Sequence, residues 1–283
     1  MSRMETQIER PALYNILRWL VPVAAICAFA AWMYLSPEGA LGKLDAIGYA
    51  VCHRIDERSF HIGERQLPLC ARCTGEFFAA GVTLLFQVFV SGKRSKLPSR
   101  GIIAVLVIFF LAFGVDGSNS YLYLLKGTAG SALESIPNLY VPNNTLRLFT
   151  GSGMGIALAM VLYPVVNQTL WRELDERPAL EWKSFGMLVA VIAILDLLVL
   201  TESPVVLYPV AWLSALGTLS LLVIVFSIVW MIVMRQDNTY TNVRQMALPF
   251  LAGLTLALLM ILSIDLVRLQ LTGTWSGFPG LSG

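Results

Sequence analysis

Residues 207–234 read LYPVAWLSALGTLSLLVIVFSIVWMIVM and contain no Asp, Glu, Lys or Arg. A helix that crosses the hydrocarbon core of a bilayer needs about 20 mainly apolar residues. Its backbone N–H and C=O groups must bond within the segment, because the bilayer core supplies no water. This stretch therefore predicts a transmembrane helix, and with it a membrane protein.

Six further apolar segments have the length of a membrane span. They lie near residues 15–36, 75–91, 101–125, 146–166, 184–202 and 246–268. The whole chain is 57% hydrophobic and 13% charged, whereas ordinary soluble domains have about 25% charged residues. The composition excludes a soluble fold and predicts an all-α, polytopic transmembrane helix bundle of about seven spans. We expect a multi-pass protein of the cell membrane that is surrounded by the lipid bilayer.

The charge pattern gives the expected orientation. Cytoplasmic loops carry the excess of Lys and Arg in membrane proteins, and the densest basic run here is Lys93–Arg100. Twelve of the 20 Lys and Arg residues lie on the same side of the membrane as the N-terminus if seven spans are counted. We therefore expect a cytoplasmic N-terminus. The formal net charge is only +2, without a long basic block, so nucleic acid is not an expected partner. No motif indicates a protein partner.

The chain divides into few parts on this basis. We expect five parts: a cytoplasmic N-terminus (1–14), a first span (15–36), an extracytoplasmic loop (37–74), a six-helix remainder of the bundle (75–268) and a C-terminal tail (269–283). The loop 37–74 is the one polar connection of any size, so a separate soluble domain is not expected.

The loop concentrates the residues with metal-binding side chains. Both histidines and three of the four cysteines lie there, at Cys52, His53, His61, Cys70 and Cys73. Zinc in structural sites is held tetrahedrally by Cys and His, and a C-x-x-C pair supplies two sulfurs from one turn. The pattern predicts a Cys3His zinc site in which His53 or His61 is the fourth ligand. An iron–sulfur centre with the same ligands is a rarer alternative.

The same cysteines also fit thiol–disulfide exchange. Thr74 is a candidate N-cap for the second span, which places Cys73 at a helix N-terminus, where the pKa of a thiol is lowered. Cys70 and Cys73 could then form a reactive pair, with Cys52 as a shuttle. A purely structural bond or contact between the cysteines is a third reading. A c-type haem is excluded, because Thr74 and not His follows the C-x-x-C.

Two short strings resemble a known family signature. Cys52-His53 and the string Cys70-Ala71-Arg72-Cys73-Thr74-Gly75, with Asp116-Gly117 and the stretch from Asn144 to Gly155, resemble the domain of unknown function 2085 family of bacterial and archaeal membrane proteins. The resemblance covers roughly residues 45–165 and implies a membrane module without an established activity. It favours His53 over His61 as the fourth ligand. Glu76 departs from the family pattern, in which an apolar residue is expected.

Polar residues inside the spans are a second candidate site. Such residues are costly in a bilayer and usually face the bundle interior or a cavity. Counted along seven spans, the ionisable ones lie in the outer halves, near the cysteine loop. We expect Asp116 to pair with Arg147, and Asp265 to pair with Arg268 on the same helix face. The expected intramembrane polar site comprises Asp116, Asn119, Asn144, Arg147, Asp196 and Asp265.

Three classes of function follow from these features. The first is a membrane protein in which zinc caps the helix bundle. The second is an enzyme, either a thiol–disulfide oxidoreductase that uses the C-x-x-C or a metal-assisted lipid-modifying enzyme with Asp116 or Asp196 as base. The third is a transporter of a small molecule or lipid. The chain contains no phosphate-binding loop or dinucleotide fingerprint, so the sequence assigns no reaction.

Overall fold

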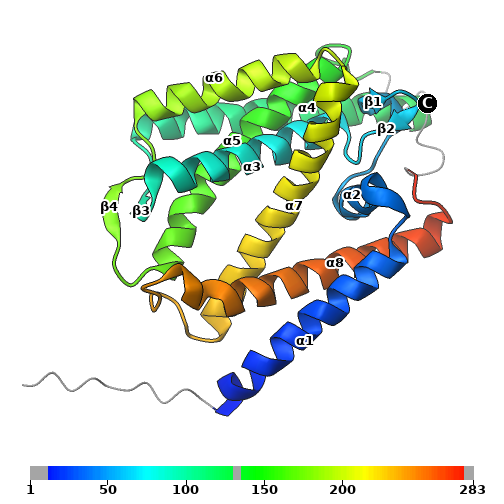
Figure 1. Cartoon of the computed structure of the whole chain (residues 1–283). Helices are drawn as coiled ribbons and strands as arrows, with labels where there is room; N and C mark the ends of the chain where they lie inside the picture. The colour runs from blue at the N-terminus through cyan, green and yellow to red at the C-terminus, as the bar shows by residue number, and fades with distance from the viewer. Residues whose placement is uncertain (1–11, 130–134, 277–283) are drawn as a thin grey trace, which may run out of the picture.

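The computed structural model of the chain describes residues 12–129 and 135–276 (Figure 1). Residues 1–11 of the predicted cytoplasmic N-terminus and 277–283 of the C-terminal tail lie outside the described residues. Seven described helices are long and apolar enough to cross a membrane. They are α1 (Ala12–Leu35), α3 (Ala71–Ser91), α4 (Arg100–Ala129), α5 (Asn144–Leu170), α6 (Trp182–Val199), α7 (Pro204–Val233) and α8 (Ala247–Thr272). The predicted all-α transmembrane bundle is confirmed.

An eighth helix, α2 (Gly39–Val51), lies within the segment that the sequence indicates as a loop. With 13 residues it is too short to cross a bilayer. Its apolar side chains Leu44, Ile47 and Tyr49 are buried, and the helix contacts α7 and α8. The short helix η1 (Asp56–Arg58) and the hairpin of β1 (His61–Ile62) and β2 (Arg65–Gln66) follow it.

Helix α3 is central to the packing, because it contacts both α5 and α7. Glycines permit the approach of α3 and α5. A Cβ atom on Gly155 would lie 2.0 Å from the carbonyl oxygen of Glu76, and one on Gly151 would lie 2.1 Å from that of Arg72. Small residues allow such backbone contact between membrane helices. The two helices therefore form one closely packed pair along the bundle.

The first and last long helices lie side by side. In Figure 1, α1 and α8 run together along one edge of the bundle, and α7 connects that edge to the group of α3, α4, α5 and α6. Helix α1 and helix α8 are in contact, although they are at opposite ends of the sequence. The fold therefore closes by joining the two ends of the chain.

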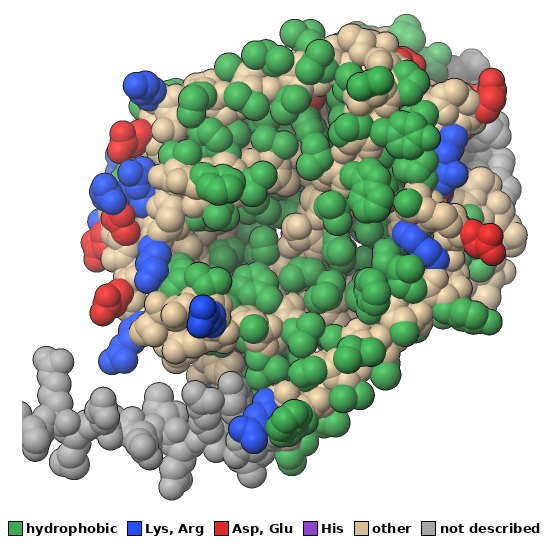
Figure 2. Space-filling view, viewed as in Figure 1, with side chains coloured by type: hydrophobic (Ala, Val, Ile, Leu, Met, Phe, Trp, Pro, Cys, Tyr) green, Lys and Arg blue, Asp and Glu red, His purple; other side chains and the backbone are tan. Residues whose placement is uncertain are grey.

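The surface has the pattern of a protein embedded in a bilayer. Figure 2 shows Lys, Arg, Asp and Glu side chains at the two ends of the molecule and hydrophobic side chains over the face between them. One end, called here the cysteine end, carries α2, residues 52–70 and the segment 135–143. The opposite end carries the parallel pair of β3 (Arg94–Lys96) and β4 (Asp175–Pro178), together with the turn η3 (Val243–Met246). The predicted basic run lies at this opposite end.

Candidate functional site

Three cysteines meet where α2 ends and α3 begins. Cys52 is the C-cap of α2 and Cys70 is the N-cap of α3, while Cys73 lies in the first turn of α3. Their Sγ atoms all lie within 4.8 Å of one another, and the Sγ atoms of Cys52 and Cys70 are 3.3 Å apart. Cys52 is buried, whereas Cys70 and Cys73 are half-buried. The structure thus brings the sequence-predicted cysteines together, close enough to bind one metal ion.

Backbone amides add to this cluster. The N–H groups of Arg54 and Cys70 donate to Cys52 Sγ at 3.4 and 3.3 Å. Arg54 has a φ of 52°, a left-handed conformation that is uncommon for residues other than glycine, and this turn aims its N–H back at the sulfur. Hydrogen bonds to a thiolate favour its charged form. These amides lower the cost of a negative charge on Cys52 Sγ, but the bond of Cys52 to Cys70 and its burial outweigh them.

The thiols differ in acidity because they hydrogen-bond to one another. The thiol of Cys52 donates to Cys70, which lowers the pKa of Cys70 well below its ordinary value, with a further contribution from Cys73. The same bond, with burial, raises the pKa of Cys52 to about 12. The thiol of Cys70 is therefore more acidic than that of Cys52.

The histidines lie outside this group. Within residues 12–129 and 135–276, the cluster of close metal-binding side chains contains the three cysteines alone. The ring of His61 lies 2.9 Å from Asp56, between Nε2 and Oδ1, and the side chain of His53 is exposed. A fourth ligand from His53 or His61 thus stays a prediction. Cys27 is on α1, where it is exposed.

The start of α3 differs from the prediction. Thr74 was the expected N-cap, but α3 begins at Ala71 and Cys70 is its N-cap. The N–H of Thr74 already donates to the carbonyl of Cys70 at 2.8 Å, and its hydroxyl donates to the carbonyl of Leu69 at 3.0 Å. The helix starts earlier because the chain between the cysteines closes the first turn.

Helix α8 holds the loop that carries Cys52. The guanidinium of Arg268 donates to three carbonyl oxygens: those of Tyr49, Cys52 at 2.5 Å and His53 at 3.0 Å. The same group lies over the ring of Tyr49, 3.9 Å from its centroid. These contacts give Arg268 another role than the expected pairing with Asp265. Asp265 is 2% exposed, and neither of its carboxylate oxygens has a hydrogen-bond partner among the described residues.

Asp116 pairs with Arg72 and not with Arg147 as expected. Arg72 Nε donates to Asp116 Oδ2 at 3.0 Å, and a second guanidinium nitrogen also donates to that oxygen. Tyr140 and Thr150 add hydroxyl donors at 2.7 and 3.2 Å. The prediction is wrong because the close approach of α3 and α5 brings the first turn of α3 against α4. Arg147 instead donates to Asn144 Oδ1 at 2.8 Å.

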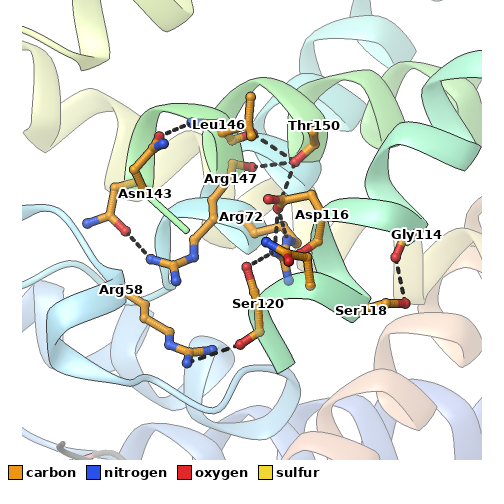
Figure 3. A network of polar contacts seen from close by, with 12 residues as sticks. Arg58, Arg72, Gly114, Asp116, Ser118, Ser120, Asn143, Leu146, Arg147 and Thr150 are labelled. Carbon is orange, nitrogen blue, oxygen red and sulfur yellow. Dashed lines mark hydrogen bonds and ion pairs between the residues drawn. The ribbon is translucent and has the colours of Figure 1, made fainter. Parts of the chain in front are cut away.

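Four of the predicted intramembrane polar residues join one network at the cysteine end, and Figure 3 labels two of them, Asp116 and Arg147. They are Asp116, Asn119, Asn144 and Arg147. Asn119 holds the segment before α5 by bonds to Tyr140 O at 3.0 Å and Leu139 N at 2.9 Å. Asn144 donates to the loop carbonyl of Glu57 at 3.3 Å. The network thus ties α4, α5 and the cysteine loop together.

The other two predicted residues make separate contacts. Asp196 on α6 is 1% exposed and accepts a hydrogen bond from Ser152 on α5 at 2.8 Å, while Asp265 is on α8. The sequence reading missed Arg72, Tyr140 and Arg58 as members of the polar network. Arg72 stands between the paired cysteines, so its position in the C-x-x-C was the one signal available.

A family model and two archaeal proteins are similar to part of this chain. Residues 52–161 match the family described as "Predicted membrane protein (DUF2085)". An uncharacterised protein of Methanocaldococcus jannaschii is 23% identical over 131 residues, which are 46% of this chain and 72% of the relative. An uncharacterised protein of Methanothermobacter thermautotrophicus is 29% identical over 111 residues, or 39% of this chain and 83% of the relative. No solved structure matches the chain. The resemblance read from the sequence is thus confirmed: residues 52–161 of this chain match the DUF2085 family of predicted membrane proteins.

Proposed function

We propose that Cys52, Cys70 and Cys73 bind a zinc ion that fastens the cysteine loop to the end of the helix bundle. The observation that carries this proposal is the mutual distance of the three Sγ atoms, at most 4.8 Å. Three thiolates with a fourth ligand are a common structural zinc set. His53, which directly follows Cys52, is the proposed fourth ligand, and His61 is the alternative.

The position of the cluster supports a structural role. One sulfur comes from the end of α2 and two from the start of α3, so a metal ion would join the two helices through Cys52 and Cys70, which are 18 positions apart in the chain. The main chain at Cys52 is already held by Arg268 of α8. A site that is closed by four protein ligands leaves no position for a reacting water. The proposal is therefore a membrane protein with a zinc-stabilised cap.

Elemental analysis of the full-length protein, purified in a non-ionic detergent, tests the proposal. We expect about one zinc per chain, with loss of zinc in the Cys70→Ser/Cys73→Ser variant. Cys27→Ser is the matched control, because it removes a thiol that is outside the cluster. His53→Ala and His61→Ala then identify the fourth ligand, since only one of them should lower zinc affinity. Wild-type protein without any bound metal would refute the zinc site.

The short distance between Cys52 and Cys70 supports thiol–disulfide exchange as the second candidate. At 3.3 Å, their sulfurs need little movement to form a disulfide. Oxidation would remove two electrons and two protons, and an external disulfide acceptor would receive them. Alkylation of the purified protein before and after dithiothreitol, read by mass spectrometry, separates the candidates. A redox pair predicts thiols that are protected until reduction, whereas a zinc site predicts thiols that are protected until chelation.

A further inference from the structure

Three guanidinium groups converge at the cysteine end of the bundle. Arg58 ends η1, Arg72 is in the first turn of α3 and Arg147 is in the first turn of α5. Figure 3 shows their side chains directed into the space between α4, the start of α5 and the loop before α3. Because Arg72 and Arg147 are in the first turns of two expected membrane spans, we expect the group to lie near the membrane surface.

The positive charge of this arginine group is only partly compensated. Arg72 is in an ion pair with Asp116. In the described part of the chain, no carboxylate lies within 4.0 Å of Arg58 or Arg147, so these two guanidinium groups bond neutral oxygens. Arg58 donates to the carbonyl of Ser120 at a long 3.4 Å. Arg147 is 7% exposed, and its Nε has no hydrogen-bond partner. Buried donors of this kind are normally satisfied, so the group has unused capacity for an anion.

An apolar groove begins beside this arginine group. It has a volume of about 390 Å³, and its polar wall comprises Asp116, Tyr140 and Thr150. Its apolar wall includes Ile108, Leu111 and Val115 of α4, which are 49–62% exposed and face outward from the bundle. A second groove of about 410 Å³ shares Leu111 and Val115 and continues along α4. Asp116 therefore connects the two features: it lines the groove, and it is paired with Arg72 of the arginine group.

We infer that Arg58, Arg72 and Arg147 bind the anionic, phosphate-bearing headgroup of a membrane lipid whose acyl chain lies in the groove along α4. Guanidinium groups present forked donors that match phosphate oxygens. The arginine group is at headgroup level, and the groove extends from it toward the exposed apolar face of α4. A lipid fits both parts, whereas a free anion would use the arginines alone. The inference does not require a bound metal, although the charge of Cys70 acts on Arg58 and Arg147.

Lipid titration of the delipidated full-length protein in non-ionic detergent tests this site, with bound lipid read by native mass spectrometry. The probes are dioleoyl phosphatidylglycerol, dioleoylglycerol without phosphate, and free glycerol phosphate. We expect phosphatidylglycerol to bind more tightly than either of the others. Arg58→Gln and Arg147→Gln should each weaken its binding by about tenfold, the loss of a charge-assisted hydrogen bond. Arg65→Gln is the matched control, because Arg65 is at the same end but pairs with Asp45.

Each alternative result overturns the inference. Equal binding of phosphatidylglycerol and dioleoylglycerol would show that the arginines do not recognise the headgroup, and equal binding of free glycerol phosphate would show a free-anion site. Unchanged binding in both arginine variants would place the lipid elsewhere. If Arg147→Gln does not fold, the half-buried Arg58 carries the test, with Arg58→Lys expected to retain part of the affinity. Zinc content measured in the same samples separates failure here from failure of the metal proposal.

Discussion

Arg268, near the end of the last helix, donates a hydrogen bond to the main-chain carbonyl of Cys52 at 2.5 Å. The contact joins the start of the cysteine cluster to a helix that is more than 200 residues away in the chain. It makes the geometry of the cluster depend on the completed bundle and not on the loop alone.

Replacement of Arg268 should therefore disturb the cluster without removing a ligand. We expect Arg268→Gln to lower the free energy of unfolding by about 2–4 kcal/mol, because three carbonyl acceptors lose a charged donor. Zinc affinity should fall as well. Thermal unfolding in detergent and zinc titration measure the two effects, and Arg177→Gln, at the opposite end, should change neither. Normal zinc affinity in Arg268→Gln would contradict the proposed dependence.

The approach of α3 and α5 predicts a sharp difference between two glycines. In Gly155→Ala the new methyl group would meet the carbonyl oxygen of Glu76, whereas nothing lies within 4 Å of a methyl group on Gly114. We expect Gly155→Ala to lower the free energy of unfolding by about 1–3 kcal/mol, as overpacking does, and Gly114→Ala to leave it unchanged. Folded yield by size-exclusion chromatography and thermal unfolding measure the effect. Equal stability of the two variants would show that the helices do not touch here.

The ion pair of Arg72 and Asp116 predicts coupled effects. Asp116→Asn leaves the Arg72 guanidinium without its carboxylate. Because breaking a buried ion pair is destabilising, we expect the free energy of unfolding to fall by about 3 kcal/mol. Asp196→Asn is the control with the same substitution, since an amide oxygen can still accept from Ser152. The double variant Asp116→Asn/Arg72→Gln should recover part of the loss. Additive effects in this double-mutant cycle would exclude a direct pair.

Zinc binding should depend on pH in a definite direction. The raised pKa of Cys52, about 12, means that this thiol must lose its proton when a metal binds, whereas the pKa of Cys70 is lowered by its bond from Cys52. Binding therefore releases protons, and zinc affinity should rise with pH and fall on acidification. Titration calorimetry in two buffers of different ionisation enthalpy measures the protons released. Affinity that is independent of pH would argue against thiolate ligands.

The orientation of the chain stays a prediction of the charge pattern. Glu64 and Glu173 are exposed at opposite ends of the molecule. In intact cells, an impermeant maleimide should label Glu64→Cys and should reach Glu173→Cys only after permeabilisation. The native chain under the same conditions gives the background from its own cysteines. The reverse pattern would place the cysteine end in the cytoplasm.

Hydropathy alone predicts the seven spans, because the bilayer sets the length of a membrane helix and each span can be recognised from its own run of apolar residues. It did not identify α2, whose 13 residues form a helix only because α7 and α8 cover its apolar side. The N-cap predicted at Thr74 is wrong for a similar local reason: Cys70, a predicted metal ligand, is also the N-cap of α3, which begins at Ala71.

The cysteine cluster was readable because ligand type and spacing are properties of the sequence. The sequence did not predict which partner each charged side chain would bind. Arg72 on α3 pairs with Asp116 on α4, which is 44 positions away in the chain. Arg268 bonds the carbonyl of Cys52, which is 216 positions away. Such pairings depend on which helices become neighbours, and the pattern of a single span contains no information on that choice. The same holds for Arg58 and Arg147, which converge only after α4 and α5 have packed.

The contact of α1 with α8 has a consequence for the order of synthesis. Because a chain emerges from the ribosome beginning with its N-terminus, α1 is made before the other six described spans and its neighbour α8 after them. Until α8 is made, the side of α1 that contacts it must therefore be covered by lipid, or by a chaperone or insertase. A ribosome that stalls after α7 would leave both this helix and the Cys52 loop without the partner that holds them. Such an incomplete chain would be a recognisable target for membrane quality control.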